Sequence, residues 1–475
     1  MNTSTAFAFI ACVALSGCAT SAPSSGLVIS NVTVISPERS GPLEHAYLRI
    51  VDGKIAELSK HPLRGVQNID GAGRYLIPGL IDSHVHLALP PGFPPAMSAE
   101  QAAAHPGLVA AELEQDPKSF LFFGFTTLID LVGTAERTAR WNRYALRPDA
   151  HYCGAAAVIN GQLREILYPY FSYGVPFEQR LAPVTDSSQQ TPVAVVERIA
   201  AAGAICVKTI YEVGLTPTVA EIRALVAAAH ARNLPVLIHA NRMKAQAFAV
   251  DAGVDIIAHG MWRNPGEPVE LDEDARRVLA AVIRDKIGYQ PTTQVIAGFV
   301  DMHRADYFAD PRLADAYPAA LIEFYASKDG TAGVPDWIRN GNADMVTHAR
   351  DTVTRANAVT RILADADARL LFGSDTPSDL IYTNPAGLNG RIEMSHWTDS
   401  GIPAPKLFRA LTLDNARAFH LEDKIGSVET GKTANLLLLR DNPLQGVTAY
   451  DTIETVFIHG RPVSRAGLSA RATSR

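Results

Sequence analysis

The feature that most constrains the fold is an alternation, from Tyr75 to about Phe419, of short apolar segments with amphipathic stretches. Short apolar runs that alternate with helices are typical of a parallel β-sheet. Candidate strands end near His86, Leu131, Ala157, Lys208, His239, His259, Gln290 and Gly373. Helices are predicted between them, for example over residues 219–233 and 242–252, where apolar residues recur at three- and four-residue steps. Eight parallel strands fit a closed barrel.

The two ends of the chain have a different pattern, that of short β-strands. Alternating runs occur between residues 27 and 69, with an Asp52-Gly53 turn signal, and the pattern returns at 435–439 and 455–458. The sequence therefore predicts an α/β protein with a (β/α)8 barrel over residues 79–420. A small β-sandwich-like domain would be assembled from both chain ends, residues 27–78 and 421–465, and residues 466–475 would form a tail. The length of 475 residues suits a barrel of roughly 250 residues plus an accessory domain.

Residues 291–342 are longer than a barrel connection needs, and a long insertion after a barrel strand often covers a site. For most of its aromatic residues we nevertheless expect a packing role. They are Phe299, Tyr307, Phe308, Tyr317, Phe324, Tyr325 and Trp337.

The first residues have the pattern of an export signal. Residues 6–15 form an apolar run that is too short to span a bilayer and ends in small residues. The following Leu15-Ser16-Gly17-Cys18 resembles a bacterial lipobox, in which the chain is cut before a cysteine that then carries lipid. We predict a signal peptide over residues 1–18, lipidation of Cys18, a linker over residues 19–26, and a location in the cell envelope, lipid-anchored to a bacterial membrane and facing the periplasm. Simple secretion is the alternative, because no Lys or Arg precedes the apolar run.

The charge of the chain limits the binding partners that are expected, and its cysteines predict the redox state of the barrel. The net charge is −6 and no Lys/Arg run is present, which argues against binding nucleic acid. The expected partner is a small molecule in the barrel mouth. Membrane contact is expected only through the lipid, and the composition is compatible with a homo-oligomer. Because Cys12 leaves with the signal and Cys18 is lipidated, Cys153 and Cys206 are predicted to remain as buried, inert thiols.

Six side chains that can bind metal fall at predicted strand ends in chain order. They are His84, His86, Lys208, His239, His259 and Asp375. Strand side chains alternate, so the first two histidines share one face and can grip one ion. A buried lysine can lose its charge, and a neutral amine that captures carbon dioxide becomes a carboxylate able to bridge two ions. Asp130 also ends a strand, but we expect it to cap a helix or loop.

Several segments carry a resemblance to the amidohydrolase superfamily, binuclear type, from residue 27 to about 463. They are Pro-Gly-Leu-Ile-Asp-Ser-His-Val-His at 78–86, Gly-Phe-Thr-Thr-Leu-Ile-Asp at 124–130, Ala-Gly-Val-Asp at 252–255 leading to His-Gly at 259–260, and Gly-Ser-Val-Glu-Thr-Gly-Lys-Thr-Ala-Asn at 426–435. The last segment has Ala-Asn where relatives usually have Ala-Asp. The sequence looks most like the dipeptidase- and imidazolonepropionase-like branch.

The resemblance implies a metal centre with defined roles. One divalent ion would be held by His84, His86 and Asp375, a second by His239 and His259, and a carbamate on Lys208 would bridge them. Zinc is the expected metal, with manganese, cobalt and iron as the alternatives. A hydroxide shared by the ions would attack the substrate. Asp375 would act as the general base, and Tyr211 would donate to the developing oxyanion.

The reaction implied is hydrolysis of an amide or peptide-like C–N bond in a small molecule, such as an N-acyl amino acid or a dipeptide. Hydrolysis of a lactone, ester or phosphotriester is the first alternative, and a non-catalytic metal- or ligand-binding lipoprotein is the second. The dipeptidase-like branch is expected to carry a histidine after the third strand and a tyrosine two residues after the fifth-strand histidine. Here these stretches read Asn160-Gly161-Gln162 and His239-Ala240-Asn241, which argues against a dipeptide with a free carboxylate.

Overall fold

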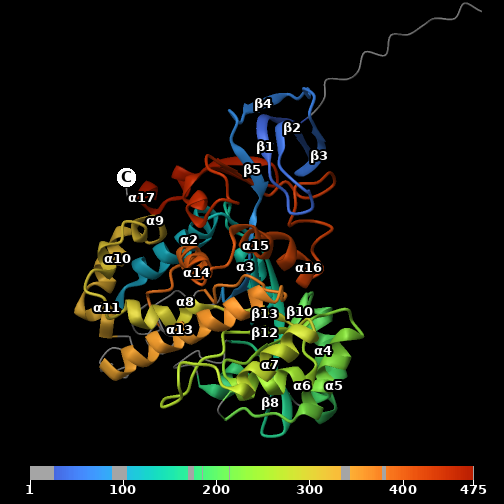
Figure 1. Ribbon diagram of the computed structural model, residues 1–475, viewed down its shortest axis with the longest axis vertical. Coiled ribbons are helices and arrows are strands. Elements are labelled where there is room, and N and C mark those ends of the chain that lie inside the picture. The colour runs from blue at the N-terminus through green and yellow to red at the C-terminus, as the bar shows by residue number, and fades with distance from the viewer. Residues whose placement is uncertain are drawn as a thin grey trace, which may run out of the picture.

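The computed structural model describes residues 26–87, 104–168, 176–184, 186–212, 214–332, 343–376 and 381–473. The predicted signal peptide with Cys18 and the linker up to residue 25 lie outside these residues. In Figure 1 the first and last strands of the chain lie together in a small domain at one end of the molecule, and the barrel with its helices forms the rest. The predicted fold class, a barrel with a small β domain from both chain ends, is confirmed.

The small domain is one eight-stranded sheet in the order β16-β15-β14-β5-β1-β2-β3, with β4 paired to β1. Its strands are β1 (Leu27–Val34), β2 (Leu43–Val51), β3 (Lys54–Ser59), β4 (Gln67–Asp70), β5 (Tyr75–Pro78), β14 (Leu436–Leu439), β15 (Ile453–Ile458) and β16 (Arg461–Ser464). The antiparallel pair of β5 and β14 joins the two chain ends. Asp52 and Gly53 have φ of 49° and 74° and form the predicted two-residue hairpin turn between β2 and β3.

The barrel wall is a parallel sheet in the order β13-β12-β11-β10-β8-β7-β6, from which the hairpin strand β9 extends antiparallel to β8. Its strands are β6 (Leu80–Val85), β7 (Phe125–Asp130), β8 (Asp149–Ile159), β9 (Gln162–Ile166), β10 (Cys206–Ile210), β11 (Val236–His239), β12 (Ile256–Ala258) and β13 (Gly288–Gln290). The eighth wall position is taken by residues 370–376, which join their neighbours through the single parallel bridges Tyr289–Leu370 and Val85–Thr376. These bridges close the barrel.

Helices cover the outside of this wall. They are α2 (Pro106–Phe122), α3 (Ala135–Trp141), α4 (Pro192–Ala201), α5 (Val219–His230), α6 (Met243–Ala252), α7 (Glu273–Arg284), α8 (Thr293–Asp301), α13 (Ala343–Asp365), α14 (Leu388–Asp399), α15 (Ala404–Arg409) and α16 (Asn415–Ala418). The two helices predicted by residue number correspond to α5 and α6. A capping box of Thr218 and Glu221 begins α5, and Gly253 ends α6 in the left-handed conformation.

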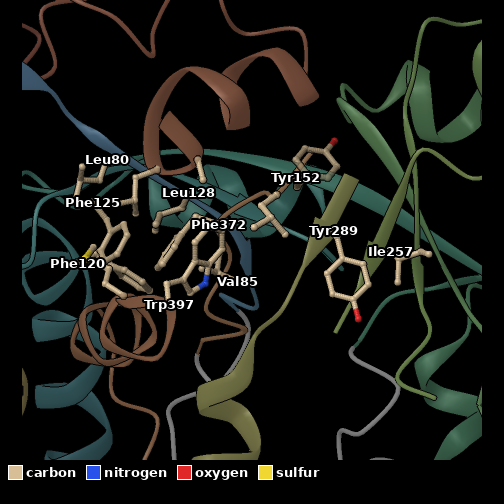
Figure 2. Packing of buried hydrophobic residues seen from close by; sticks show 14 of the residues in the cluster. Leu80, Val85, Phe120, Phe125, Leu128, Tyr152, Ile257, Tyr289, Phe372 and Trp397 are labelled. Carbon is tan, nitrogen blue, oxygen red and sulfur yellow. The ribbon is translucent and has the colours of Figure 1, made fainter. Parts of the chain in front are cut away.

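Aromatic packing between the wall and α14 is shown in Figure 2. The ring of Phe372 stacks on Phe125 of β7 at a centroid distance of 5.8 Å and contacts Trp397 of α14 at 5.9 Å. All three side chains are almost completely buried. Since buried aromatic pairs contribute about 0.5–1.5 kcal/mol beyond the area they bury, this packing supports the segment that closes the barrel.

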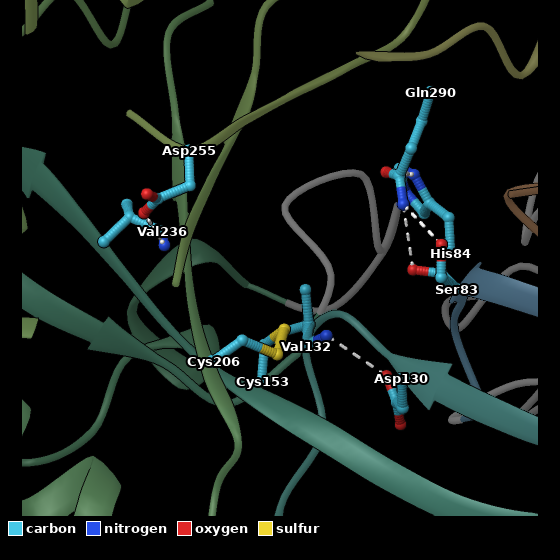
Figure 3. The surroundings of a disulfide bond; sticks show 9 residues. All are labelled: Ser83, His84, Asp130, Val132, Cys153, Cys206, Val236, Asp255 and Gln290. Atoms are coloured by element: carbon cyan, nitrogen blue, oxygen red, sulfur yellow. Dashed lines mark hydrogen bonds between the residues drawn. A yellow bond between two sulfur atoms is a disulfide. The ribbon is translucent and has the colours of Figure 1, made fainter. Parts of the chain in front are cut away.

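The barrel interior below the predicted site is apolar. The state of the two cysteines in it differs from the prediction. Cys153 and Cys206 are not free thiols but form a disulfide, shown in Figure 3. They lie opposite each other on the neighbouring strands β8 and β10, with their Cα atoms 4.4 Å apart. The prediction was wrong because cysteines 53 residues apart are brought together only by the register of two parallel strands, which the sequence does not display.

The insertion over residues 291–342 forms α8 followed by short helices, η3 (Tyr307–Ala309), α9 (Leu313–Ala316), α10 (Ala319–Tyr325) and α11 (Lys328–Ala332). The expected packing role of its aromatics is confirmed for Tyr307, Tyr317, Phe324 and Tyr325, which are buried. Phe299 and Phe308 are partly buried against the same core. Trp337 lies outside the described residues, and a covering function of the insertion stays a prediction.

Part of the C-terminal segment predicted as a tail is buried, from Leu468 to Ala470. The segment forms η6 (Arg465–Leu468) and α17 (Ala470–Thr473), buries Leu468, and binds Asp315 through Ser469. Among the described residues no helix is both long enough and apolar enough to cross a bilayer.

Candidate metal centre

Closure of the barrel brings three of the predicted ligands together. The backbone N–H of Asp375 donates to the carbonyl of His84 at 2.7 Å, which joins β6 to the eighth wall position. The carboxylate oxygen Oδ1 of Asp375 then lies 3.1 Å from Nε2 of His84 and 2.8 Å from Nε2 of His86. Both histidines thus face the same carboxylate oxygen.

The histidines from β11 and β12 join this group. The ring centroid of His259 lies 5.0 Å from that of His84 and 4.4 Å from that of His239, and its Nδ1 lies 3.7 Å from Oδ2 of Asp375. His84, His259 and Asp375 can each offer one ligand atom, and these atoms lie within 4.8 Å of one another. The cluster therefore has the donor types and spacing of a metal site.

Lys208 is the cationic side chain of the group. It lies on β10 with only 7% of its surface exposed, and its Nζ has no hydrogen-bond partner. Burial lowers the pKa of Lys208 to about 8. Burial lowers the pKa values of His84, His239 and His259, and the charge of the Lys208 ammonium lowers them further.

A hydrogen-bond chain fixes which nitrogen of His84 faces Asp375, and Figure 3 shows its first part. The amide Nε2 of Gln290 donates to the carbonyl and the hydroxyl oxygen of Ser83 at 3.1 and 2.8 Å. Its Oε1 therefore faces Nδ1 of His84 at 3.1 Å and can only accept. From this network we infer that His84 carries its proton on Nδ1.

The consequence is an unfavourable contact unless a cation is present. Burial lowers the pKa of His84 to about 3, so the ring is neutral and its Nε2 carries a lone pair. This buried nitrogen has no hydrogen-bond partner, yet it faces the carboxylate oxygen of Asp375. Two acceptors in contact repel each other, and a divalent ion with nitrogen and oxygen ligands removes the repulsion.

The other two buried histidines also have side-chain partners. Nε2 of His239 lies 3.0 Å from the carboxylate of Glu212, and Nδ1 of His259 lies 2.8 Å from the hydroxyl of Thr292. Metal-binding histidines are typically oriented in this way by a partner on one ring nitrogen. Sequence reasoning missed Glu212, Gln290 and Thr292 as orienting residues. Gln290 ends a predicted strand and could have been noticed, whereas nothing in the sequence singles out Thr292.

The backbone is strained where the site is assembled. His259, Asp375 and Thr292 have φ angles of 81°, 60° and 45°, a region that non-glycine residues seldom adopt. Such conformations cost on the order of 1–3 kcal/mol each and tend to occur at functional sites. Their occurrence at two proposed ligands and one orienting residue supports a functional assignment of this cluster.

Other singled-out residues have simpler surroundings. The ring of Tyr211 packs 4.6 Å from that of Phe248 on α6, so its role as oxyanion donor stays a prediction. Asp130 accepts from the backbone N–H of Val132, the expected capping role. Asn160 and Gly161 form the two-residue turn of the hairpin between β8 and β9.

Comparison with known proteins identifies the family. Residues 75–283 and 336–463 match the model of the amidohydrolase family, and the chain belongs to that family. Its members typically bind divalent metal ions, in agreement with the cluster of His84, His259 and Asp375.

Individual relatives match over shorter stretches or at lower identity. N-acetylglucosamine-6-phosphate deacetylase from Lysinibacillus sphaericus is 41% identical over 61 residues, 13% of this chain and 15% of that protein. Dihydroorotase from Pelotomaculum thermopropionicum is 44% identical over 68 residues, 14% of this chain and 16% of that protein. The chain thus matches only about 15% of the length of these relatives.

Solved structures resemble the chain over nearly its full length. A Xaa-Pro dipeptidase aligns with a TM-score of 0.62 and 20% identity, covering 92% of this chain and 99% of that one. The ochratoxinase of A. niger aligns with a TM-score of 0.64 and 15% identity, covering 95% and 98%. At these identities the likeness establishes the fold.

Binding of a divalent metal should stabilise the protein, because an ion relieves the contact between His84 and Asp375. We expect Zn²⁺ to raise the melting temperature and a chelator to lower it. At a free concentration of 100 times Kd, one site contributes about 2.7 kcal/mol. Differential scanning calorimetry on metal-stripped and reloaded protein measures this. An identical melting temperature with and without metal would contradict the assignment of the site.

Proposed function

We propose that this chain is a metal-dependent hydrolase that cleaves an amide or peptide-like C–N bond in a small molecule, such as an N-acyl amino acid or a dipeptide. The observation that carries the proposal is the cluster in which Nε2 of His84 lies 3.1 Å from the carboxylate of Asp375 and in which His84, His259 and Asp375 offer ligand atoms within 4.8 Å of one another. His84, His86 and Asp375 would hold one ion and His239 and His259 a second, with zinc the proposed metal.

The names of similar proteins support this reaction class. The structural neighbours include a Xaa-Pro dipeptidase, a prolidase and a phenylurea hydrolase, and the curated relatives include a deacetylase and a dihydroorotase. Several of these names describe cleavage of bonds to nitrogen. These names do not agree on one substrate, so we propose only the type of bond that is cleaved.

Lys208 is proposed to carry a carbamate that bridges the two ions. Its amine reacts with carbon dioxide to form an N–C bond and release one proton, which leaves a carboxylate in place of a cation. The reaction requires the neutral amine, and burial supports it by lowering the pKa of Lys208 to about 8. The change of sign also removes the repulsion between an ammonium and bound metal ions.

The chemistry can be divided between the ions and the chain. Bound divalent ions would supply a water-derived nucleophile at neutral pH and polarise the scissile carbonyl. Asp375 would accept the proton released from the nucleophile and return it to the leaving nitrogen.

Substitution Asp375→Asn should abolish turnover while the protein retains metal. An amide cannot accept the proton, and loss of general acid–base catalysis costs about 10²–10⁴-fold in rate. The assay compares kcat of the wild type and the variant on a panel of N-acyl amino acids and dipeptides, with metal content measured in parallel. The panel also contains a lactone and a paraoxon-like phosphotriester. Turnover of only these last two, or full activity of the variant, would overturn the proposed reaction or the proposed base.

Substitution Lys208→Ala should lower activity and should be rescued by short carboxylates such as formate or propionate, which can replace the carbamate. Activity is measured against carboxylate concentration, and Lys118→Ala serves as the control. Lys118 pairs with Glu114 on the surface of α2 and should behave as the wild type. A variant that binds metal but is not rescued would argue against a carbamate.

We also propose that the protein is lipid-anchored to a bacterial membrane through Cys18, in the cell envelope and facing the periplasm. This rests on the sequence Leu15-Ser16-Gly17-Cys18 and the apolar run before it. The active site would then meet substrates outside the cytoplasm.

Substitution Cys18→Ser should abolish incorporation of a clickable palmitate analogue in a bacterial host and move the protein from the membrane fraction to the soluble fraction. Cys12→Ser is the matched control, since it changes a cysteine that is removed with the signal and should leave labelling intact. Labelling that persists in Cys18→Ser would contradict the lipid assignment.

A further inference from the structure

Glu212 is a carboxylate at the edge of the candidate metal centre that the six predicted ligands do not include. It follows β10, and its backbone N–H donates to the carbonyl of Leu215 at 3.1 Å while the N–H of Leu215 donates back at 2.8 Å. Only 14% of its side chain is exposed. This paired backbone holds the carboxylate beside the end of β11.

The carboxylate of Glu212 has a defined set of donors. Its Oε2 lies 3.0 Å from Nε2 of His239 and accepts from Nδ2 of Asn241 at 3.2 Å. Asn241 is itself buried, with 5% of its surface exposed, and its backbone carbonyl accepts from the N–H of Trp262 at 2.7 Å. A residue that is fixed at both ends therefore holds the carboxylate against the histidine.

This contact decides the tautomer of His239. A carboxylate oxygen accepts, so the ring must donate from Nε2. The lone pair of the neutral ring then lies on Nδ1, and this is the nitrogen that can bind metal. His84 has the opposite arrangement, since its Nδ1 is directed at Gln290 and its Nε2 faces Asp375.

The chemistry of the orienting partner also differs between the histidines. His84 has the neutral amide of Gln290 and His259 has the neutral hydroxyl of Thr292, whereas His239 has a carboxylate. A carboxylate partner raises the basicity of a ligating imidazole, and its loss typically costs 10- to 100-fold in metal affinity.

We propose that Glu212, held by Asn241, is a positioning residue that fixes Nδ1 of His239 as a metal ligand and strengthens binding of the second ion. The inference rests on the proposed function, in which His239 is a ligand. The proposal distinguishes the two metal sites. Loss of Glu212 should weaken binding of the ion at His239 and leave the ion at His84, His86 and Asp375 in place.

The test is a titration of the metal-stripped, purified full-length chain with Zn²⁺ in competition with a chromogenic chelator. Wild type should take up two ions. In Glu212→Gln the first should bind as in the wild type and the second about 10- to 100-fold more weakly. Glu212→Ala, which loses the acceptor altogether, should be weaker still. Glu165→Gln is the matched control, since Glu165 is similarly buried but pairs with Arg198 outside the cluster.

The outcomes separate the inference from the function on which it rests. Wild-type protein that binds no metal would overturn the proposed function. Two ions bound with unchanged affinity in both Glu212 variants would overturn the positioning role alone. The visible spectrum of the Co²⁺-loaded protein distinguishes positioning from direct ligation. Glu212→Gln at full occupancy should keep the wild-type spectrum, and a changed spectrum would assign Glu212 as a ligand and overturn the positioning role.

Discussion

The structure depends on the bonds that close the barrel between its first strand and its eighth wall position. The side-chain amide of Asn415 spans the two, since it donates to the carbonyls of Ile81 and Phe372 at 2.9 and 2.8 Å. Asn415 is fully buried, and each unmade hydrogen bond there would cost about 1–3 kcal/mol. The backbone bond from Asp375 to His84 continues the same seam. The candidate metal site therefore depends on closure of the barrel, which places Asp375 beside His84.

The apolar side chains beneath the candidate metal site lower the pKa of Lys208. On β10 the side chains of Cys206 and Lys208 share the inward face, with the cysteine one layer deeper. The disulfide to Cys153 and the buried Phe419 belong to one apolar cluster that fills this deeper layer. A lysine above a sealed apolar floor loses solvation on that side, and burial is indeed the main reason for its lowered pKa. The packing of the barrel floor thus supports the neutral amine that the proposed chemistry requires.

The sequence predicted those parts of the site that follow from local periodicity. The two-residue repeat placed His84 and His86 on one face, and the order of strand ends in a parallel barrel placed Asp375 at the same mouth. Contacts made sideways between strands could not be predicted. The disulfide of Cys153 depends on the register of β8 and β10, and Glu212 reaches the cluster only because the chain turns back after β10. Fold class and strand ends could therefore be predicted from the sequence, whereas the residues that orient the ligands are brought to them only by the three-dimensional fold.

The arrangement around Asn241 bears on which part of a substrate this side of the site accepts. The dipeptidase-like branch is expected to carry a tyrosine at this position, whose phenol could donate to an anionic group. Here the amide of Asn241 is directed at Glu212, so the nearest donor is already engaged by a carboxylate of the protein itself. A negative charge in a mostly buried position repels a second one, since solvent screens the interaction poorly. If the centre acts as proposed, this side of it would favour a neutral or cationic portion of the substrate over a carboxylate.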